Sequence, residues 1–169
     1  MEQKYTYTTV EQEVRQLWER EKIFAYDNSK KPTFSIDTPP PTVSGSIHVG
    51  HVFSYTQTDI IARFNRMKEL NVFYPFGFDD NGLATERFVE KKRAVNAFSL
   101  GRSAFIKLCL EETELAEHQF KELWQAVGLS VDWTLWYSTI APNVRKISQE
   151  SFILLYNKGL VYRKSEPAL

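Results

Sequence analysis

The sequence predicts an α/β fold with parallel strands, preceded by a helical arm at the N-terminus. Short apolar segments at 31–37 and 72–76 have the length and composition of buried strands. Between them, apolar residues recur at helical spacing from Val49 to about Asn71. A strand–helix–strand unit takes a right-handed crossover, which makes its two strands parallel.

The arm is assigned to residues 1–32, and the body of the fold to 33–169. Thr8 or Thr9 can cap a helix that runs to about Lys22. The apolar stripe of this helix consists of Val10, Val14, Leu17 and Trp18. We expect this stripe to pack the arm onto the body.

The remaining elements follow from the same periodicity and from turn residues. Helices are expected over 83–95, 103–127 and 142–159, loops over 77–82 and 130–133, an extended piece over 136–139 and a strand over 160–163. A domain seldom stops directly after a strand and a proline turn. We therefore expect the chain to be a piece of a longer protein.

Composition excludes several classes of protein. Lysine plus arginine and aspartate plus glutamate both number 21, so no net cationic field indicates a nucleic-acid surface. The single cysteine, Cys109, excludes an internal disulfide and a cysteine cluster for zinc. No apolar run approaches the roughly 20 residues of a membrane helix, and Met1–Thr6 holds no signal core. We expect a cytoplasmic protein without a membrane partner.

Two of the three histidines, His48 and His51, open the predicted helix. A stiff segment, Pro39–Pro41, and a loop containing Gly45 precede them. A helix N-terminus carries unpaired backbone N–H groups and the positive end of the helix dipole, which suits an anion. Two imidazoles add side-chain donors there, so we expect this segment to handle a nucleotide phosphate.

The loop at 77–82 follows the second predicted strand. Ligands of open parallel sheets bind at the carboxyl ends of the strands, so this loop and the histidine segment share one rim. A carboxylate of Asp79 or Asp80 can fix an ammonium group there. Pro39–Pro41 can form an apolar wall for a small aliphatic side chain. Together these features describe an amino acid that meets a nucleotide.

Other interpretations stay open at this level. The histidine pair with Asp79 or Asp80 can bind a metal ion, although the zinc-protease helix has a different histidine spacing and a glutamate. The two aspartates can also form a solvated turn. Gly50 indicates either a tight helix contact or a flat ligand ring resting on bare backbone. Neither of the two common glycine-rich phosphate loops is present.

Two motifs carry a resemblance to a known family. P-P-P-x-V-[ST]-G-x-[LI]-H-[IV]-G-H stands at 39–51, and G-[FWT]-D-x-x-G-[LI]-x-T-[EQ] at 77–86. They resemble the class I aminoacyl-tRNA synthetases, specifically the valine branch in its archaeal-type form. Residues 128–133 and 159–163 are similar as well. The resemblance implies the first half of a Rossmann-like nucleotide-binding domain, ending before the editing insertion.

The resemblance also implies roles for individual residues. His48 and His51 would be catalytic, stabilising the α-phosphate of ATP. The implied ATP site is Thr42, Gly45, His48, Gly50 and His51, and the implied valine site is Pro40, Pro41 and Asp79. Thr42 replaces an asparagine that is common at its position. ATP with Mg²⁺, valine and tRNA(Val) are the implied partners, and no residue is assigned as a metal ligand.

The second signature of the family, a lysine-rich K-M-S-K-S loop, does not occur in the sequence. We therefore expect feeble or no adenylation activity from this chain alone, and no editing. A stand-alone nucleotidyltransferase that also uses H-x-G-H is one alternative. A non-catalytic chain that binds a nucleotide or a partner protein is another.

Overall fold

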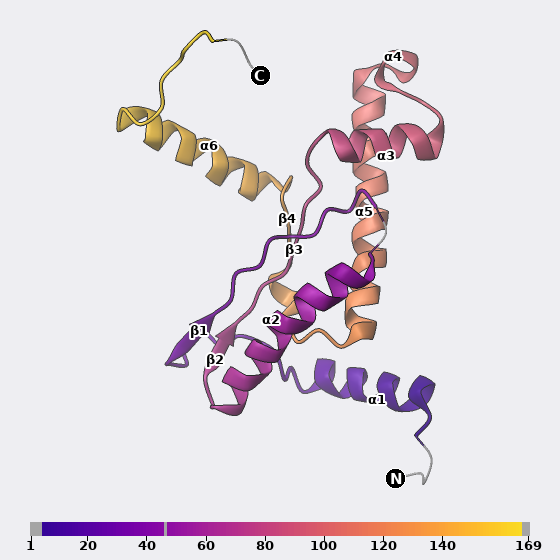
Figure 1. Cartoon of the computed structure of the whole chain (residues 1–169), viewed down its shortest axis with the longest axis vertical. Coiled ribbons are helices and arrows are strands. Elements are labelled where there is room, and N and C mark those ends of the chain that lie inside the picture. The colour runs from indigo at the N-terminus through magenta and orange to yellow at the C-terminus, as the bar shows by residue number, and fades with distance from the viewer. Residues whose placement is uncertain (1–4, 46, 167–169) are drawn as a thin grey trace.

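The computed structural model describes residues 5–45 and 47–166. The chain order is α1 (Tyr7–Arg20), β1 (Thr33–Ser35), α2 (Val49–Met67), β2 (Asn71–Phe73), β3 (Gly77–Phe78), α3 (Leu83–Arg93), α4 (Ala97–Leu100), α5 (Arg102–Val127), a 3₁₀ turn (Trp133–Leu135), β4 (Tyr137–Ser138) and α6 (Pro142–Asn157) (Figure 1). Ser46, part of the expected glycine loop, and the chain end at 167–169 lie outside the described residues.

The strands pair in parallel, as the sequence predicts. β1 pairs with β2, placing Phe34 opposite Val72, and β3 pairs with β4, placing Gly77 opposite Tyr137. Helix α2 connects β1 to β2 (Figure 1). The first two strands are shorter than predicted, and β3 occupies the start of a segment predicted as a loop. The predicted strand–helix–strand unit is confirmed in kind but not in its bounds.

The first strand changes register where its prolines stand. Thr33 pairs with Asn71, but further along an isolated parallel bridge pairs Thr42 with Asp79. Between these two pairings, the segment from Thr33 to Thr42 is therefore one residue longer than the segment from Asn71 to Asp79. Proline has no N–H to donate to a ladder, so Pro39–Pro41 interrupts the pairing and holds the extra residue.

The core is aromatic and lies between α2, α5 and the second strand. Tyr55 of α2 contacts Trp124 of α5, with ring centroids 4.8 Å apart, and Phe76 at 5.4 Å. Trp124 and Phe76 are almost fully buried. Phe78 extends this cluster towards β4, its ring centroid lying 5.5 Å from that of Phe76. The cluster fixes β3, and with it the residues that follow β3, against both helices.

The N-terminal arm packs on the body through Trp18, as expected from the apolar stripe. Its ring lies edge-on to Phe24 at 5.1 Å, and the guanidinium of Arg63 on α2 lies 5.3 Å from the Trp18 ring. No residue of α1 is fully buried. The division into an arm at 1–32 and a body at 33–169 stays a prediction.

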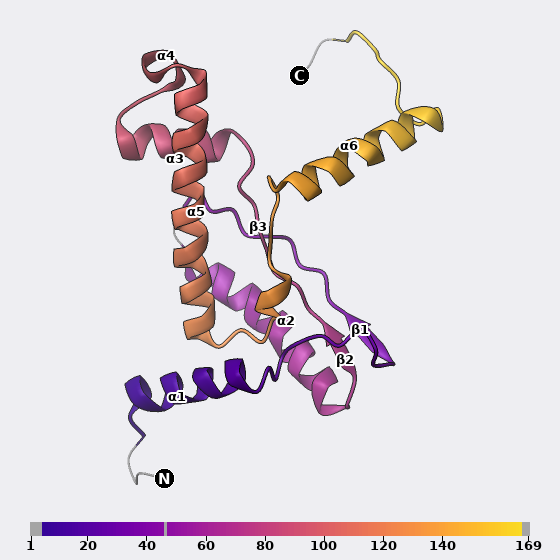
Figure 2. The ribbon, with the colours of Figure 1, turned by 180° about the vertical axis from the view of Figure 1, so that it is seen from behind.

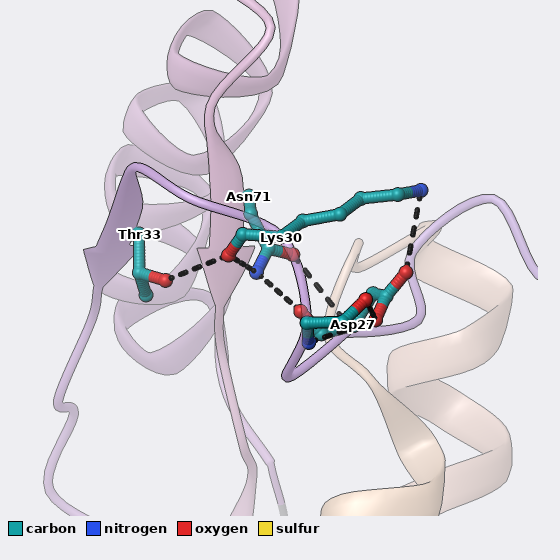
Figure 3. A network of polar contacts seen from close by, with 5 residues as sticks. Asp27, Lys30, Thr33 and Asn71 are labelled. Atoms are coloured by element: carbon teal, nitrogen blue, oxygen red, sulfur yellow. Dashed lines mark hydrogen bonds and ion pairs between the residues drawn. The ribbon is translucent and has the colours of Figure 1, made fainter.

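A polar network joins the segment between α1 and β1 to the start of β2 (Figure 3). The side-chain amide of Asn71 donates to the carbonyls of Asp27, at 2.7 Å, and Lys30, at 3.0 Å. The ammonium of Lys30 lies 3.5 Å from the Asp27 carboxylate. These contacts fix the position from which the chain enters β1.

Helix α6 extends away from the sheets and the other helices in both views (Figures 1 and 2). No residue of α6 is buried, and Phe152 and Leu154 are both more than half exposed. The strand predicted over 160–163 is wrong, since these residues have no regular secondary structure. A strand requires a neighbour for its backbone groups, and no described segment pairs with this one.

Two short elements were missed by the periodicity. α4 is capped by Asn96, whose side chain accepts from the N–H groups of Phe98 and Ser99. The segment predicted as a loop over 130–133 runs into the 3₁₀ turn, which begins at Trp133. Both are single turns, too short for an apolar repeat to show.

Within residues 5–45 and 47–166, no helix has the length and hydropathy to cross a membrane.

Candidate functional site

The two histidines form a linked pair at the start of α2. The Nδ1 atom of His48 accepts from the N–H of Gly50 at 3.2 Å, and Nδ1 of His51 accepts from the N–H of His48 at 3.4 Å. Their ring centroids are 4.0 Å apart. A neutral imidazole that accepts at Nδ1 carries its proton on Nε2. Among the described residues, neither Nε2–H group donates to a protein acceptor, so each ring offers one N–H donor.

For Gly50 and His51, this pairing corrects the expectation of unpaired backbone donors at the helix start. The N–H of Gly50 is bonded to the His48 ring, and the N–H of His51 donates to the His48 carbonyl at 2.9 Å. The sequence shows histidines but not that one of them caps its own helix. The donors that the two rings can offer to a ligand are therefore their Nε2–H groups.

The two rings differ in exposure. His48 is exposed and His51 is half-buried. Burial lowers the pKa of His51, and the nearby charge of His48 lowers it further. Because the ordinary pKa of histidine is already below 7, His51 is a neutral donor at neutral pH.

Gly50 has a structural explanation in this arrangement. A Cβ at this position would lie 3.0 Å from Cε1 and Nδ1 of His48, closer than ordinary packing allows. The absence of a side chain lets the imidazole fold back over the helix start. At Gly45, by contrast, a Cβ would meet nothing within 4 Å. The tight contact that explains Gly50 is therefore with the ring of His48.

Asp79 lies beside the proline segment. Its N–H donates to the carbonyl of Pro41 at 2.8 Å, and its carbonyl accepts from the N–H of Val43 at 3.2 Å. Thr42 lies between these two contacts and pairs with Asp79 in the sheet. Pro41 is buried, whereas Thr42 is exposed. The fold thus brings Asp79 beside two predicted site residues, Pro41 and Thr42, that are far from it in the sequence.

The carboxylate of Asp79 is oriented by two further donors. Its Oδ1 accepts from the hydroxyl of Thr139 and from the N–H of Asn81, both at 3.2 Å. The same Thr139 oxygen accepts from the N–H of Asp80 at 3.1 Å. Sequence reasoning missed Thr139, because only the pairing of β3 with β4 brings residue 139 to this rim.

The proline segment is also tied to α2. The hydroxyl of Tyr55 donates to the carbonyl of Pro39, and burial raises the pKa of Tyr55 to about 12. Pro40 is half-buried between Pro39 and the buried Pro41. The segment Pro39–Pro41 is therefore held by Tyr55 of α2 at one end and by Asp79 at the other.

A second missed residue, Asp59, connects α2 to the segment after α5. Its Oδ1 accepts from the N–H of Ser130 at 2.7 Å, and its Oδ2 accepts from Arg63 at 2.7 Å. Arg66 donates to the carbonyl of Ser130 at 2.8 Å. The sequence signal that could have identified it is an aspartate in the interior of a predicted helix, next to its apolar residues. Its role is to hold the helix that carries the histidines.

All predicted site residues except Gly45 fall into two groups, and Gly45 lies on the loop between them. His48, Gly50 and His51 form the first group, and Pro40, Pro41, Thr42 and Asp79 the second. In the described part of the chain, no group of three or more His, Cys, Asp or Glu side chains could hold a metal ion. A cavity of about 490 Å³ lies elsewhere, between α1 and the end of α5, and none of the predicted site residues lines it.

Comparisons with known proteins identify the family of this chain. Residues 13–168 match the family model described as tRNA synthetases class I (I, L, M and V). The chain is 53% identical over 98% of its length to a valine–tRNA ligase of Rickettsia akari, of which it covers 21%. It is 50% identical over its whole length to the valine–tRNA ligase of Wolbachia sp. subsp. Brugia malayi, of which it covers 20%.

A solved structure supports the fold. The crystal structure of a ternary complex of the Agrobacterium radiobacter K84 LeuRS with tRNA and LeuAMS matches with a TM-score of 0.75 and 26% identity. The match covers 95% of this chain and 19% of that one. The chain thus spans about a fifth of the length of the curated relatives it matches.

Proposed function

Because the chain belongs to the class I tRNA synthetases of the isoleucine, leucine, methionine and valine group, we propose that it supplies the amino-acid-activating half-site of a valine–tRNA ligase. In the proposed reaction, valine and ATP form valyl-adenylate and pyrophosphate. The valyl group then passes to tRNA(Val). The identity of about half of all residues with valine–tRNA ligases supports valine as the amino acid.

The histidine pair would act on the phosphate. A carboxylate oxygen of valine attacks the α-phosphorus of ATP, and the bond from this phosphorus to the bridging oxygen of pyrophosphate breaks. Negative charge builds on the α-phosphoryl oxygens as the new bond forms. The Nε2–H groups of His48 and His51 would donate to these oxygens. Donors that are fixed before the reaction stabilise such a charge without reorganisation.

The second group would hold valine. The carboxylate of Asp79 would bind the α-ammonium group, while Pro40 and Pro41 would contact the isopropyl side chain. A wall of this kind is apolar and therefore rejects threonine only weakly. Thr42, Gly45 and Gly50 would line the path of ATP, with Gly50 permitting close approach of the adenine.

Mg²⁺ would accompany ATP in this proposal. The described residues provide no carboxylate cluster that fits a protein-bound metal ion. We therefore assign no step to a metal held by this part of the chain. Contacts with tRNA(Val) would lie mostly in other parts of the protein, and a cytoplasmic location follows from the proposed role.

The observation that carries the proposal is the double backbone contact of Asp79 with Pro41 and Val43. It holds the Asp79 carboxylate, the proposed partner of the ammonium group, beside Pro41, on the segment that continues to the histidine pair. A stand-alone nucleotidyltransferase and a non-catalytic binding chain are both less favoured, because the family match spans nearly the whole chain.

The test is valine-dependent ATP–pyrophosphate exchange, with isoleucine and threonine as competing amino acids. It is run on this chain and on a chimaera in which this chain replaces the matching residues of the Rickettsia akari ligase. We expect exchange in the chimaera with valine and little with isoleucine. A His48→Ala/His51→Ala double variant should lose it. Exchange that survives the double variant, or that prefers isoleucine, contradicts the proposal.

A further inference from the structure

Two neighbouring hydroxyls at the end of β4 bind the two neighbouring aspartates that follow β3. The hydroxyl of Thr139 donates to Oδ1 of Asp79 at 3.2 Å, and the hydroxyl of Ser138 donates to Oδ2 of Asp80. Successive side chains of a strand point to opposite faces of the sheet, so each hydroxyl meets the aspartate on its own face. Thr139 therefore shares a face with Asp79, the proposed partner of the valine ammonium group.

Thr139 forms the last rung of the hydrogen-bond ladder between the two strands. The N–H of Tyr137 donates to the carbonyl of Phe76, and the N–H of Thr139 donates to that of Phe78, both at 3.0 Å. In a parallel ladder the next bond would run from the N–H of Asp80 to the carbonyl of Thr139. It runs instead to the hydroxyl of Thr139, at 3.1 Å. The hydroxyl thus takes the place of a backbone acceptor.

The bond from the N–H of Asp80 fixes the direction of the Thr139 hydroxyl proton. A hydroxyl has one proton to donate, and an oxygen that accepts from an N–H must direct its proton elsewhere. The carboxylate of Asp79 is the acceptor that this proton meets. Oδ1 of Asp79 also accepts from the N–H of Asn81 at 3.2 Å. Oδ1 therefore receives two donors whose directions the backbone sets.

The second carboxylate oxygen of Asp79 is left for a ligand. Within residues 5–45 and 47–166, no N–H, hydroxyl or cationic side chain binds Oδ2, and both donors to Oδ1 are neutral. Asp79 is half-buried, so solvent or a ligand can reach it. An ionised carboxylate accepts through both of its oxygens, and an ammonium group has only donors. Oδ2 is therefore suited to bind the ammonium group.

Resting on the proposed function, we propose that Thr139 is a positioning residue for valine. Its hydroxyl holds Oδ1 of Asp79, and this contact leaves Oδ2 to bind the α-ammonium group. Thr139 touches neither substrate in this arrangement. The contact from Asn81 is local and would form in many turns that an aspartate opens, whereas the contact from Thr139 crosses between strands. The orientation of Asp79 thus depends on β4.

The first measurement is steady-state valine-dependent ATP–pyrophosphate exchange in the chimaera with the Rickettsia akari ligase. Thr139→Val keeps the branched shape of the side chain but removes the hydroxyl. We expect KM for valine to rise about three- to tenfold, the scale of one net hydrogen bond, with kcat and KM for ATP changed little. Thr139→Ser retains a hydroxyl and should have the KM of the wild type. An unchanged KM for valine in Thr139→Val overturns the proposal.

A double-mutant cycle shows whether Thr139 acts through Asp79. Asp79→Ala removes the carboxylate that the hydroxyl orients, so adding Thr139→Val to it should raise KM for valine no further. Changes at independent sites add in free energy, whereas changes to two residues that act through one contact do not. If the two effects on KM multiply instead, Thr139 affects valine binding by another route and is not a positioning residue for Asp79.

Loss of stability is measured separately, by urea unfolding of this chain. Thr139→Val also leaves the N–H of Asp80 without its acceptor, so we expect a lower midpoint. Thr134→Val is the matched control, because the hydroxyl of Thr134 donates to the carboxylate of Asp132 at 2.6 Å, on the wall of the cavity beside α1. It should lower the midpoint but leave KM for valine unchanged. A rise in KM that Thr134→Val shares would reflect a general loss of fold and overturn the proposal.

Failure of the proposed function gives a different result. If the wild-type chimaera shows no exchange with valine, the proposed function is wrong. The carbon-13 signal of the Asp79 carboxyl in this chain then decides whether the Thr139 hydroxyl orients that group. The signal should shift in Thr139→Val but not in Thr139→Ser or Thr134→Val. An unchanged signal in Thr139→Val overturns the positioning role whatever the exchange assay shows.

Discussion

The N–H of His48 donates to Nδ1 of His51, and the two imidazoles lie with their centroids 4.0 Å apart at the first turn of α2. Each ring is thereby oriented by backbone and keeps its Nε2–H free. His48 has two tasks in this arrangement, since its ring also caps the helix by accepting from Gly50. These tasks can be separated by mutation.

His48→Asn should retain the cap, because asparagine is a good N-cap residue. We expect its free energy of unfolding to stay within about 0.5 kcal/mol of the wild type, whereas His48→Ala should lose about 1 kcal/mol. Both should reduce valine-dependent exchange in the chimaera by about a hundred- to a thousand-fold, the scale for loss of one oxyanion donor. Full exchange in His48→Asn would show that the ring serves only as a cap.

Gly50→Ala should displace the His48 ring, since the new Cβ would lie 3.0 Å from two of its atoms. Alanine favours a helix interior over glycine by about 1 kcal/mol, so the fold should not be weakened much. We expect weaker ATP binding, measured by calorimetry, with a changed His48 ring signal in NMR spectra. Gly45→Ala is the control, because a Cβ there meets nothing within 4 Å. An unchanged His48 signal in Gly50→Ala would contradict this account.

Asp79→Asn keeps the backbone contacts with Pro41 and Val43 but removes the charge. A hydrogen bond to a charged group contributes roughly 1.5–3 kcal/mol, so KM for valine should rise about ten- to a hundredfold. KM for ATP should change little, because ATP binds at the histidine group. Steady-state exchange in the chimaera measures both. A larger effect on ATP than on valine would show that the two sites are assigned the wrong way round.

Glu112 of α5 is almost fully buried and binds Lys92 and Arg93 of α3, with Lys92 Nζ at 2.6 Å. Glu112→Gln should cost roughly 2–3 kcal/mol in urea unfolding at pH 7, below the range for fully buried pairs because both cations are half exposed. Glu111→Gln is the matched control, since Glu111 is exposed and its Lys107 partner is 3.9 Å away.

The destabilisation caused by Glu112→Gln should depend on pH, and the direction of this dependence follows from the pKa of Glu112. The hydrogen bond from Lys92, together with Arg93, lowers the pKa of Glu112 below its ordinary 4.5. The stabilisation is therefore present above pH 4.5 and is lost as pH falls through the lowered pKa. The difference between the wild type and Glu112→Gln should shrink in acid. A difference that stays constant below pH 4 would contradict the ion-pair assignment.

Glu117 should behave in the opposite way. Its pKa is raised from 4.5 to about 8, so the folded state keeps a proton that the unfolded state loses. The stability that this proton contributes is complete below pH 4.5 and is lost as pH rises to about 8. Relative to the wild type, Glu117→Gln should therefore gain stability across this interval in urea unfolding. A difference that is flat with pH would show an ordinary carboxyl.

The sequence by itself determined the longer helices, the parallel pairing of the first two strands and the family. These features depend on apolar repeats and on motifs such as the histidine segment. Each of these signals lies within one continuous stretch of residues. The capping turn at Asn96 and the buried Asp59 had local signals that apolar periodicity does not register. The bounds of the strands had none, because a strand ends where its neighbour stops pairing.

Only the tertiary structure decided how the site is held. Thr139 reaches Asp79 because β4 pairs with β3. The tautomers of His48 and His51 follow from a cap that the ring makes with its own helix. Contacts between distant residues depend on which strands pair and which faces pack. That choice is made by burial over the whole chain, not by any segment of it.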